Sequence, residues 1–222
     1  MSQKPLKQIE FYFDFACPYA YLASTRLTEL SAHADAEITL KPVLLGGIFR
    51  SLEQPQNMST TLSPAKARHN RLDLLRWASW LEAPLQTPLR HPNRTVEALR
   101  CLLAAPPEAA FEIVDAFYAL YWRDAADISD LQVLAGALDQ LGLDSEAILA
   151  RATSQPIKDE LRQRTDEAVA RGVFGVPTFF VGDELFFGQD RIEMVAEAAN
   201  GWEPNRELMD AFHFNQTSNE AR

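Results

Sequence analysis

Cysteine is scarce in this chain, with only Cys17 and Cys101 among 222 residues. Two cysteines cannot build the disulfide framework of a small secreted protein, so we expect a reducing compartment. Position 20 holds Ala20, so the Cys-x-x-Cys motif of a dithiol oxidoreductase is also missing. Cys101 lies in an amphipathic helical pattern between Val96 and Leu103, which predicts that its side chain fills the core.

Positive charge is scarce as well. The chain has 21 Lys and Arg residues against 31 Asp and Glu residues, which gives a net charge of −10. Nucleic-acid binding needs a basic face and is excluded, whereas a small anionic ligand needs only a few local arginines. No apolar run approaches the ~20 residues of a membrane span, and the first residues lack the apolar core of a secretory signal. No group of His, Cys and Asp has metal-ligand spacing. We therefore expect a cytoplasmic protein without a metal or a membrane partner.

The best-marked stretch of the chain surrounds Cys17. The aromatic run Ile9–Phe15 favours a β-strand, and Pro18 suits the first position of a helix that Cys17 would cap. The unpaired N–H groups and the dipole of such a helix favour a thiolate, so this position indicates thiol chemistry. The alternative is a buried cysteine that acts as a small hydrophobe.

A second stretch, Gly172–Asp183, places Pro177 just before the apolar run Thr178–Val181. X-Pro bonds adopt the cis form at low cost, and a proline at the first residue of a strand loses no ladder bond. The pattern predicts a hairpin from Thr178–Val181 to Leu185–Phe187. A further strand is predicted at Glu37–Leu44, parallel to the first because a helix connects the two.

The chain between these two stretches reads as helical from Ser63 to about Arg171. Ser129 with Gln132 fits a capping box, and Asp190 with Glu193 fits a second one at the start of the last helix. The predicted fold class is α/β, a thioredoxin-like fold with a large all-helical insertion. Its expected parts are residues 1–48 and 172–200 for the thioredoxin-like domain, 49–171 for the insertion and 201–222 for a C-terminal tail.

Three stretches resemble the DsbA-like thioredoxin superfamily, and within it 2-hydroxychromene-2-carboxylate isomerases and kappa-class glutathione transferases. Residues 11–22, Phe-Tyr-Phe-Asp-Phe-Ala-Cys-Pro-Tyr-Ala-Tyr-Leu, match the signature around the family's active site. Residues 172–179 match Gly-Val-Phe-Gly-Val-Pro-Thr-Phe, and residues 188–191 match the glutathione-binding turn. The resemblance reaches to about residue 200 and implies a glutathione-dependent enzyme that forms a homodimer.

The resemblance also implies where glutathione and a second substrate bind. Glutathione would lie at Cys17 and pair with the backbone of Val176 beside Pro177, as a short added strand. Its other expected contacts are Gln189, Asp190 and Arg191, with Asp190 and Arg191 at the γ-glutamyl end, and an amide from Gln54 or Asn57. A carboxylate substrate would meet Tyr19, Arg50 and Arg94, since arginine binds carboxylates bidentately.

Cys17 itself departs from the family, whose members mostly carry serine there to donate to the glutathione sulfur. A protonated Cys17 would imitate serine, and the enzyme would isomerise or conjugate a small aromatic-derived carboxylate. An ionised Cys17 would instead form a mixed disulfide with glutathione, which predicts monothiol disulfide exchange. A third reading is a non-catalytic thiol-binding redox sensor switched by glutathionylation of Cys17.

Overall fold

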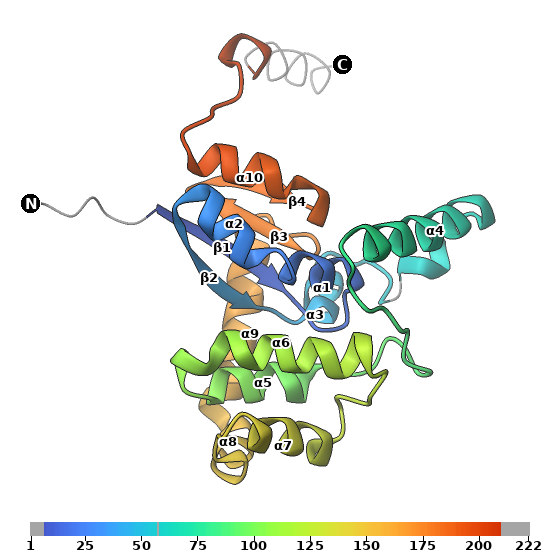
Figure 1. Cartoon of the computed structure of the whole chain (residues 1–222), viewed down its shortest axis with the longest axis vertical. Helices are drawn as coiled ribbons and strands as arrows, with labels where there is room; N and C mark the ends of the chain where they lie inside the picture. The colour runs from blue at the N-terminus through green and yellow to red at the C-terminus, as the bar shows by residue number, and fades with distance from the viewer. Residues whose placement is uncertain (1–6, 57, 210–222) are drawn as a thin grey trace, which may run out of the picture.

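A four-stranded mixed sheet forms the centre of the computed structural model, which describes residues 7–56 and 58–209 (Figure 1). The strand order is β2-β1-β3-β4. Strand β1 pairs parallel with β2 and antiparallel with β3, which pairs antiparallel with β4, so the predicted hairpin and the predicted parallel pair are confirmed. The strands are β1 Lys7–Phe13, β2 Ala36–Pro42, β3 Thr178–Val181 and β4 Glu184–Phe187.

Aromatic side chains on one face of the sheet form much of the core. Phe11 stacks on Phe13 and, across the strand pair, on Phe179. Phe15 continues this row past the end of β1 and meets Tyr118 edge to face. All of these rings are buried, so the apolar alternation of the first strand fixes how β1 sits between its neighbours.

The first helix begins at Pro18 with Cys17 as its N-cap, as predicted. Two helices, α1 Pro18–Ser24 and α2 Leu27–Ala34, connect β1 to β2. At the break, the hydroxyls of Ser24 and Thr25 donate to the carbonyls of Tyr21 and Leu22. Such local side-chain bonds to the backbone compete with the helical pattern and help to end α1.

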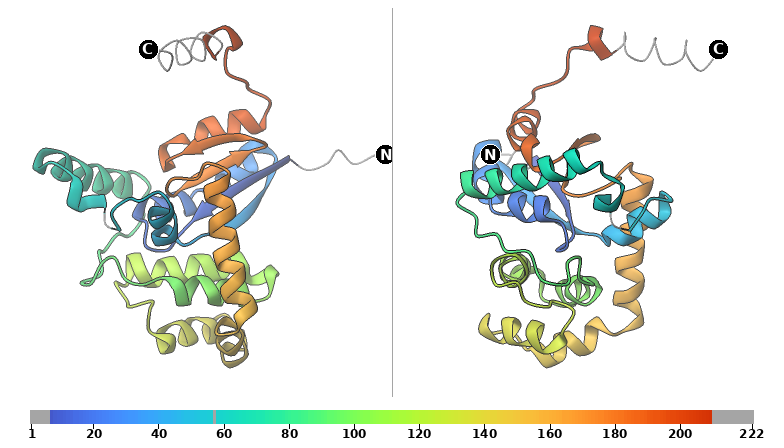
Figure 2. Two further views of the ribbon diagram at one scale, coloured as in Figure 1. Left: turned by 180° about the vertical axis from the view of Figure 1, so that it is seen from behind. Right: turned by 90° about the vertical axis from the view of Figure 1, so that its right-hand side faces the viewer.

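Helices occupy most of the chain between β2 and β3. In Figure 1, α5 to α8 form a bundle below the sheet and α4 projects to one side, while Figure 2 shows the long α9 joining the bundle to the sheet. None of the described helices is long and apolar enough to cross a membrane. The helices are α3 Leu45–Ser51, α4 Pro64–Trp80, α5 Val96–Ala104, α6 Ala110–Tyr118, α7 Leu131–Gln140, α8 Ser145–Ala152 and α9 Gln155–Ala170, with 3₁₀ turns η1 Met58–Thr61 and η2 Pro107–Ala109 and a π-helical turn η3 Ala119–Arg123.

Both predicted capping boxes are wrong. Asp130, not Ser129, caps α7, and its carboxylate accepts from the N–H of Gln132 at 2.8 Å. Ser129 instead donates its hydroxyl to Asp127. After β4 the chain forms the 3₁₀ turn η4 Gln189–Arg191 and then α10 Ile192–Ala199, which has no side-chain cap. Because η4 comes first, Asp190 lies outside α10 and cannot cap it.

Candidate active site

The end of β1 and the loop before β3 meet at Cys17. Its sulfur donates to the carbonyl oxygen of Val176 at 3.0 Å, and the Val176–Pro177 peptide bond is cis. Beyond this bond, the Pro177 carbonyl accepts from the N–H of Gly188 at 3.0 Å. The fold therefore brings three predicted stretches of sequence together at one thiol.

Burial determines the protonation of Cys17. The side chain is only 8% exposed, and this burial raises the pKa of the thiol to about 12, although the N–H groups of Ala20 and Tyr19 favour the thiolate. The charge of Asp14 raises the pKa further. The cap position predicted an acidic, exposed thiol, but desolvation outweighs the helix N-terminus, and Cys17 is a neutral hydrogen-bond donor near neutral pH.

The backbone of Val176 can pair with a peptide, because its N–H makes no backbone bond and its carbonyl is held by the Cys17 thiol alone among the described residues. Within residues 7–56 and 58–209, no backbone hydrogen bond uses its N–H or its carbonyl group. Just before it, the carbonyl of Gly175 accepts from the Thr178 hydroxyl at 2.8 Å, which holds the turn into β3. An extended peptide beside Val176 would satisfy both backbone groups as one added strand residue.

The turn at residues 188–191 offers polar groups of both charges. Gln189 is 3% exposed, and its side-chain oxygen is buried without a hydrogen-bond partner in the described part of the chain. Next to it, Asp190 and Arg191 form an ion pair at 2.9 Å, with both side chains about half exposed. The turn packs against α1, so these groups lie on the same side of the molecule as the start of that helix. An orphaned amide oxygen and an accessible ion pair suit the charged end of a peptide-like ligand.

Tyr19, in the first turn of α1, contacts helix α4. Its hydroxyl donates to the carbonyl of Asn70 on α4 at 3.5 Å, a long contact. Burial raises the pKa of Tyr19, and the charges of Asp73, Cys17 and Asp190 raise it further, so the phenol stays neutral among them.

The other residues that the sequence predicts for the site lie on separate segments. Those that the structure describes contact only residues close to them in the sequence. Arg50 is an exposed residue in the last turn of α3, and Gln54 follows that helix, with its N–H bonded to the carbonyl of Phe49. The Arg94 side chain is 64% exposed and pairs with Glu97 at 2.9 Å. Asn57 lies outside the described residues.

One group near Cys17 was not identified from the sequence. Asp14 is 1% exposed and lies under the turn that carries Cys17, whose N–H donates to the Asp14 carbonyl. The same carbonyl accepts from the Tyr118 hydroxyl at 3.3 Å. The only signal in the sequence is an acidic residue within an otherwise apolar run, which does not reveal burial.

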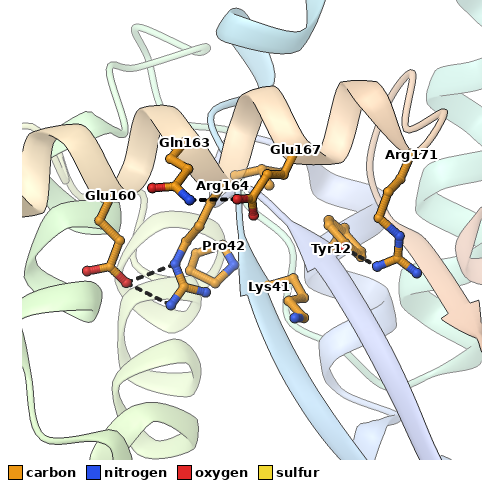
Figure 3. A pocket seen from close by; sticks show the side chains of 9 residues that line it. Tyr12, Lys41, Pro42, Glu160, Gln163, Arg164, Glu167 and Arg171 are labelled. Carbon is orange, nitrogen blue, oxygen red and sulfur yellow. Dashed lines mark hydrogen bonds and ion pairs between the residues drawn. The ribbon is translucent and has the colours of Figure 1, made fainter.

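A separate cleft of about 370 Å³ lies between α9 and strands β1 and β2, away from Cys17 (Figure 3). Arg171 and Lys41 share the carboxylate of Glu10, and Arg171 also donates to the Tyr12 hydroxyl at 2.7 Å. The guanidinium of Arg171 stacks over the ring of Phe180 at 4.0 Å. These contacts tie α9 to the sheet, so we interpret the cleft as a structural contact. No group of three or more described His, Cys, Asp or Glu residues could hold a metal ion.

Comparison with known proteins shows the family to which the chain belongs. The family model of the DSBA-like thioredoxin domain matches residues 8–200. A 2-hydroxychromene-2-carboxylate isomerase from Sphingobium xenophagum is 32% identical over 85% of this chain and 96% of its own. Glutathione S-transferase kappa 1 from Rattus norvegicus is 26% identical over 85% of this chain and 88% of its own. A solved 2-hydroxychromene-2-carboxylate isomerase structure has a TM-score of 0.78 at 27% identity, over 87% of this chain and 94% of its own. The chain therefore belongs to the DsbA-like thioredoxin family, in the group that contains the 2-hydroxychromene-2-carboxylate isomerases and the kappa-class glutathione transferases.

Proposed function

We propose that the protein is a glutathione-dependent isomerase or transferase that acts on a small aromatic-derived carboxylate such as a 2-hydroxychromene-2-carboxylate. The observation that carries this proposal is the neutral Cys17 thiol, which donates to the carbonyl just before cis-Pro177. The family relationship to isomerases and kappa-class transferases supports the same reaction class.

Glutathione fits the residues at this junction. Its backbone would pair with Val176 beside Pro177, and its γ-glutamyl end would meet Gln189, Asp190 and Arg191. The unpartnered oxygen of Gln189 supports this assignment because it lacks a donor such as an ammonium group. When bound, glutathione supplies a thiolate that adds to an electrophilic carbon, reversibly in an isomerase.

Cys17 acts in this proposal as a donor rather than as a nucleophile. Its S–H group is held at the mouth of α1 and can turn from the Val176 oxygen to a sulfur bound beside it. A donor at that position stabilises the charged sulfur, as serine does in relatives, although S–H is a weaker donor than a hydroxyl.

The second substrate would bind between Tyr19, helix α3 and the loop before α5. Arg50 and Arg94 lie on these two segments and are both exposed, so each is available to a carboxylate. Gln54, which follows α3, would reach glutathione from the same side. Arg94 would have to exchange its partner Glu97 for the substrate.

Disulfide exchange through Cys17 is the main alternative. It requires Cys17 to be a thiolate nucleophile rather than a neutral donor. A nucleophilic cysteine needs a thiolate at working pH, whereas burial raises the pKa of Cys17 to about 12. The same thiol would be slow to react in a non-catalytic redox sensor.

We place the activity in the cytoplasm, where glutathione is reduced, and propose that the active form is a homodimer. Helix α4 supports the second proposal because it exposes apolar side chains to solvent, including Trp80 at 82% exposure. Its basic residues Lys66, Arg68, Arg71 and Arg76 would complement the acidic body of a second copy, given a net charge of −10 for the whole chain.

Calorimetric titration with glutathione, followed by an isomerisation assay with and without it, tests the function. We expect binding at millimolar glutathione or below, and turnover of a 2-hydroxychromene-2-carboxylate or of a chloronitrobenzene that needs glutathione. If no heat of binding appears at millimolar glutathione, both the isomerase and the transferase are excluded. Reduction of a glutathione mixed disulfide without turnover of either electrophile would favour the alternative.

A further inference from the structure

Asp14 is a buried carboxylate without a cation. Its side chain is 1% exposed, and among the described residues no Lys, Arg or His forms an ion pair with it. Acidic residues are almost never fully buried unless they are paired, because removing a charge from water is costly. A fold that keeps such a group next to a thiol indicates that the group has a role.

Hydrogen bonds replace the missing cation. One carboxylate oxygen of Asp14 accepts from the N–H of Ala16 at 3.1 Å, and the other accepts from the N–H of Leu45 at 2.8 Å. Burial raises the pKa of Asp14, while these two bonds and the nearby Thr95 side chain act against that rise by favouring the charged form. Because backbone N–H groups can only donate, both oxygens face donors that suit a carboxylate better than a protonated acid.

These three groups come from the three segments that carry the proposed site. Ala16 belongs to the turn that ends at Cys17. Leu45 is the first residue of α3, which leads to Arg50, and Thr95 is the N-cap of α5, next to Arg94. The carboxylate therefore bonds the Cys17 turn to the start of α3, and the Thr95 side chain at the start of α5 favours its charged form.

The other titratable groups that face this carboxylate carry no positive charge. Tyr118 on α6 and Tyr121 on η3 both have a raised pKa, mainly through burial and in part through the charge of Asp14. The pKa of Cys17 is raised in the same way, mainly by burial and in part by the charge of Asp14. Nothing nearby among the described groups offsets the negative charge that Asp14 presents to the Cys17 sulfur.

We propose that Asp14 is a positioning residue whose carboxylate ties the Cys17 turn to the start of α3, and whose charge adds to the burial that keeps Cys17 a neutral donor. This inference rests on the proposed function, in which Cys17 must donate to a bound sulfur. It assigns to one buried residue the placement of the thiol and a contribution to its neutral form.

The substitution Asp14→Asn tests the electrostatic part, because it removes the charge and keeps the size. Alkylation of the Cys17 peptide by iodoacetamide, followed by mass spectrometry as a function of pH, needs neither glutathione nor turnover. We expect the midpoint to fall, because removing the negative charge makes the thiolate less costly, so that more thiolate is alkylated at a fixed lower pH. Asp115→Asn is the control, since Asp115 is also a carboxylate with a raised pKa but does not contribute to the pKa of Cys17. A folded Asp14→Asn protein with an unchanged midpoint would overturn the proposal.

Nuclear magnetic resonance of the unaltered protein tests the geometric part, even if Asp14→Asn does not fold. As the pH falls from 7, the amide proton signals of Ala16 and Leu45 should titrate with one shared midpoint above 3.8, the ordinary pKa of the group. Separate midpoints, or a shared midpoint above pH 7, would overturn the proposal while leaving glutathione binding untouched.

Discussion

The sulfur of Cys17 lies 3.0 Å from the carbonyl oxygen of Val176, a residue 159 positions later in the chain. This contact joins the start of α1 to the cis-proline loop, the two places where thioredoxin-like folds hold a thiol peptide. It also fixes the direction of the bond, because a carbonyl oxygen can only accept, and the sulfur must carry the hydrogen.

Replacing the thiol by a stronger donor should therefore preserve activity. We expect Cys17→Ser to retain glutathione-dependent isomerisation within a few-fold of the unaltered protein, because a hydroxyl donates better than S–H. Cys17→Ala removes the donor and should lower kcat by about 10²-fold, as loss of one donor to a developing charge does elsewhere. Steady-state kinetics with saturating glutathione measures both.

Cys101→Ala is the control for these variants, since Cys101 is a buried core thiol on α5 that plays no part in the proposal. It should leave kcat unchanged and cost only a little stability. Equal loss of activity in Cys17→Ser and Cys17→Ala would contradict the donor role and favour thiol exchange.

The raised pKa of Cys17 also predicts how stability depends on pH. The folded thiol has a pKa of about 12 against an ordinary value of 9.0, so the folded state holds the proton more tightly than the unfolded chain. Its stabilising effect is complete below pH 9 and is lost as the pH rises toward 12, by up to about 1.4 kcal/mol per pH unit. Urea unfolding of Cys17→Ser should show a correspondingly shallower decline over this window, and parallel curves would contradict the assignment.

The helix and strand boundaries at the site could be predicted from the sequence, because they depend on the conformational limits of single residues. Pro18 can occupy a helix only near its first position, and Pro177 can start a strand without losing a ladder bond, so both boundaries followed from the residues. The ionisation of Cys17 could not be predicted in the same way. Burial beneath distant segments, including the loop at Val176, outweighs the local helix N-terminus that favours a thiolate.

The role of Asp190 as a helix cap failed for a related reason. An acidic residue two positions before an apolar face and three before a glutamate resembles a cap, but the chain forms the turn η4 first, with Gly188 at a φ of 112°. Whether such a turn forms depends on the packing of η4 against α1, which no short stretch of sequence specifies.

Gly188 therefore offers a test of the turn that the glutathione proposal needs. A Cβ atom at this position would lie 2.5 Å from a carboxylate oxygen of Asp190, and its φ strongly favours glycine. We expect Gly188→Ala to displace Asp190 and to weaken glutathione binding by about tenfold or more, the loss of one charge-assisted hydrogen bond. Calorimetry at fixed pH measures the change.

Gly182→Ala is the matched control in the β3–β4 hairpin. Gly182 also has a positive φ, 59°, but a Cβ there would meet nothing within 4 Å. It should cost about 1 kcal/mol of stability from backbone strain and leave glutathione affinity unchanged. If both variants lose affinity equally, the effect is global and the turn is not the binding element.

The ion cluster in the separate cleft should stabilise the contact between α9 and the sheet. Burial opposes ionisation of Glu10, but hydrogen bonds from Lys41 and Arg171 outweigh it, and the pKa of Glu10 is lowered below its ordinary 4.5. A lowered folded pKa contributes stability above about pH 4.5 that is lost as the pH falls through the folded value. We expect Glu10→Gln to lose about 1–2 kcal/mol at pH 7 in urea unfolding, and to be less sensitive to acid.

Glu29→Gln removes a comparable charge from an exposed helical pair with Arg26, at 3.4 Å. Because exposed pairs contribute little, this control should change stability by less than about 0.5 kcal/mol. Equal effects of the two substitutions would mean that the Glu10 cluster is no more than a surface ion pair.

The exposed side of α4 predicts the oligomeric state. Leu75 and Trp80 are 56% and 82% exposed on a helix that projects from the body (Figure 2), a costly arrangement for a free monomer. We expect light scattering to give twice the mass of one chain, and the double substitution Leu75→Glu and Trp80→Glu to give a single chain. Leu89→Glu is the control, because Leu89 is fully exposed but lies in the loop before α5. Since Tyr19 contacts α4 through Asn70, the monomeric variant should also bind the carboxylate substrate more weakly. If the unaltered protein is itself monomeric, both expectations are wrong.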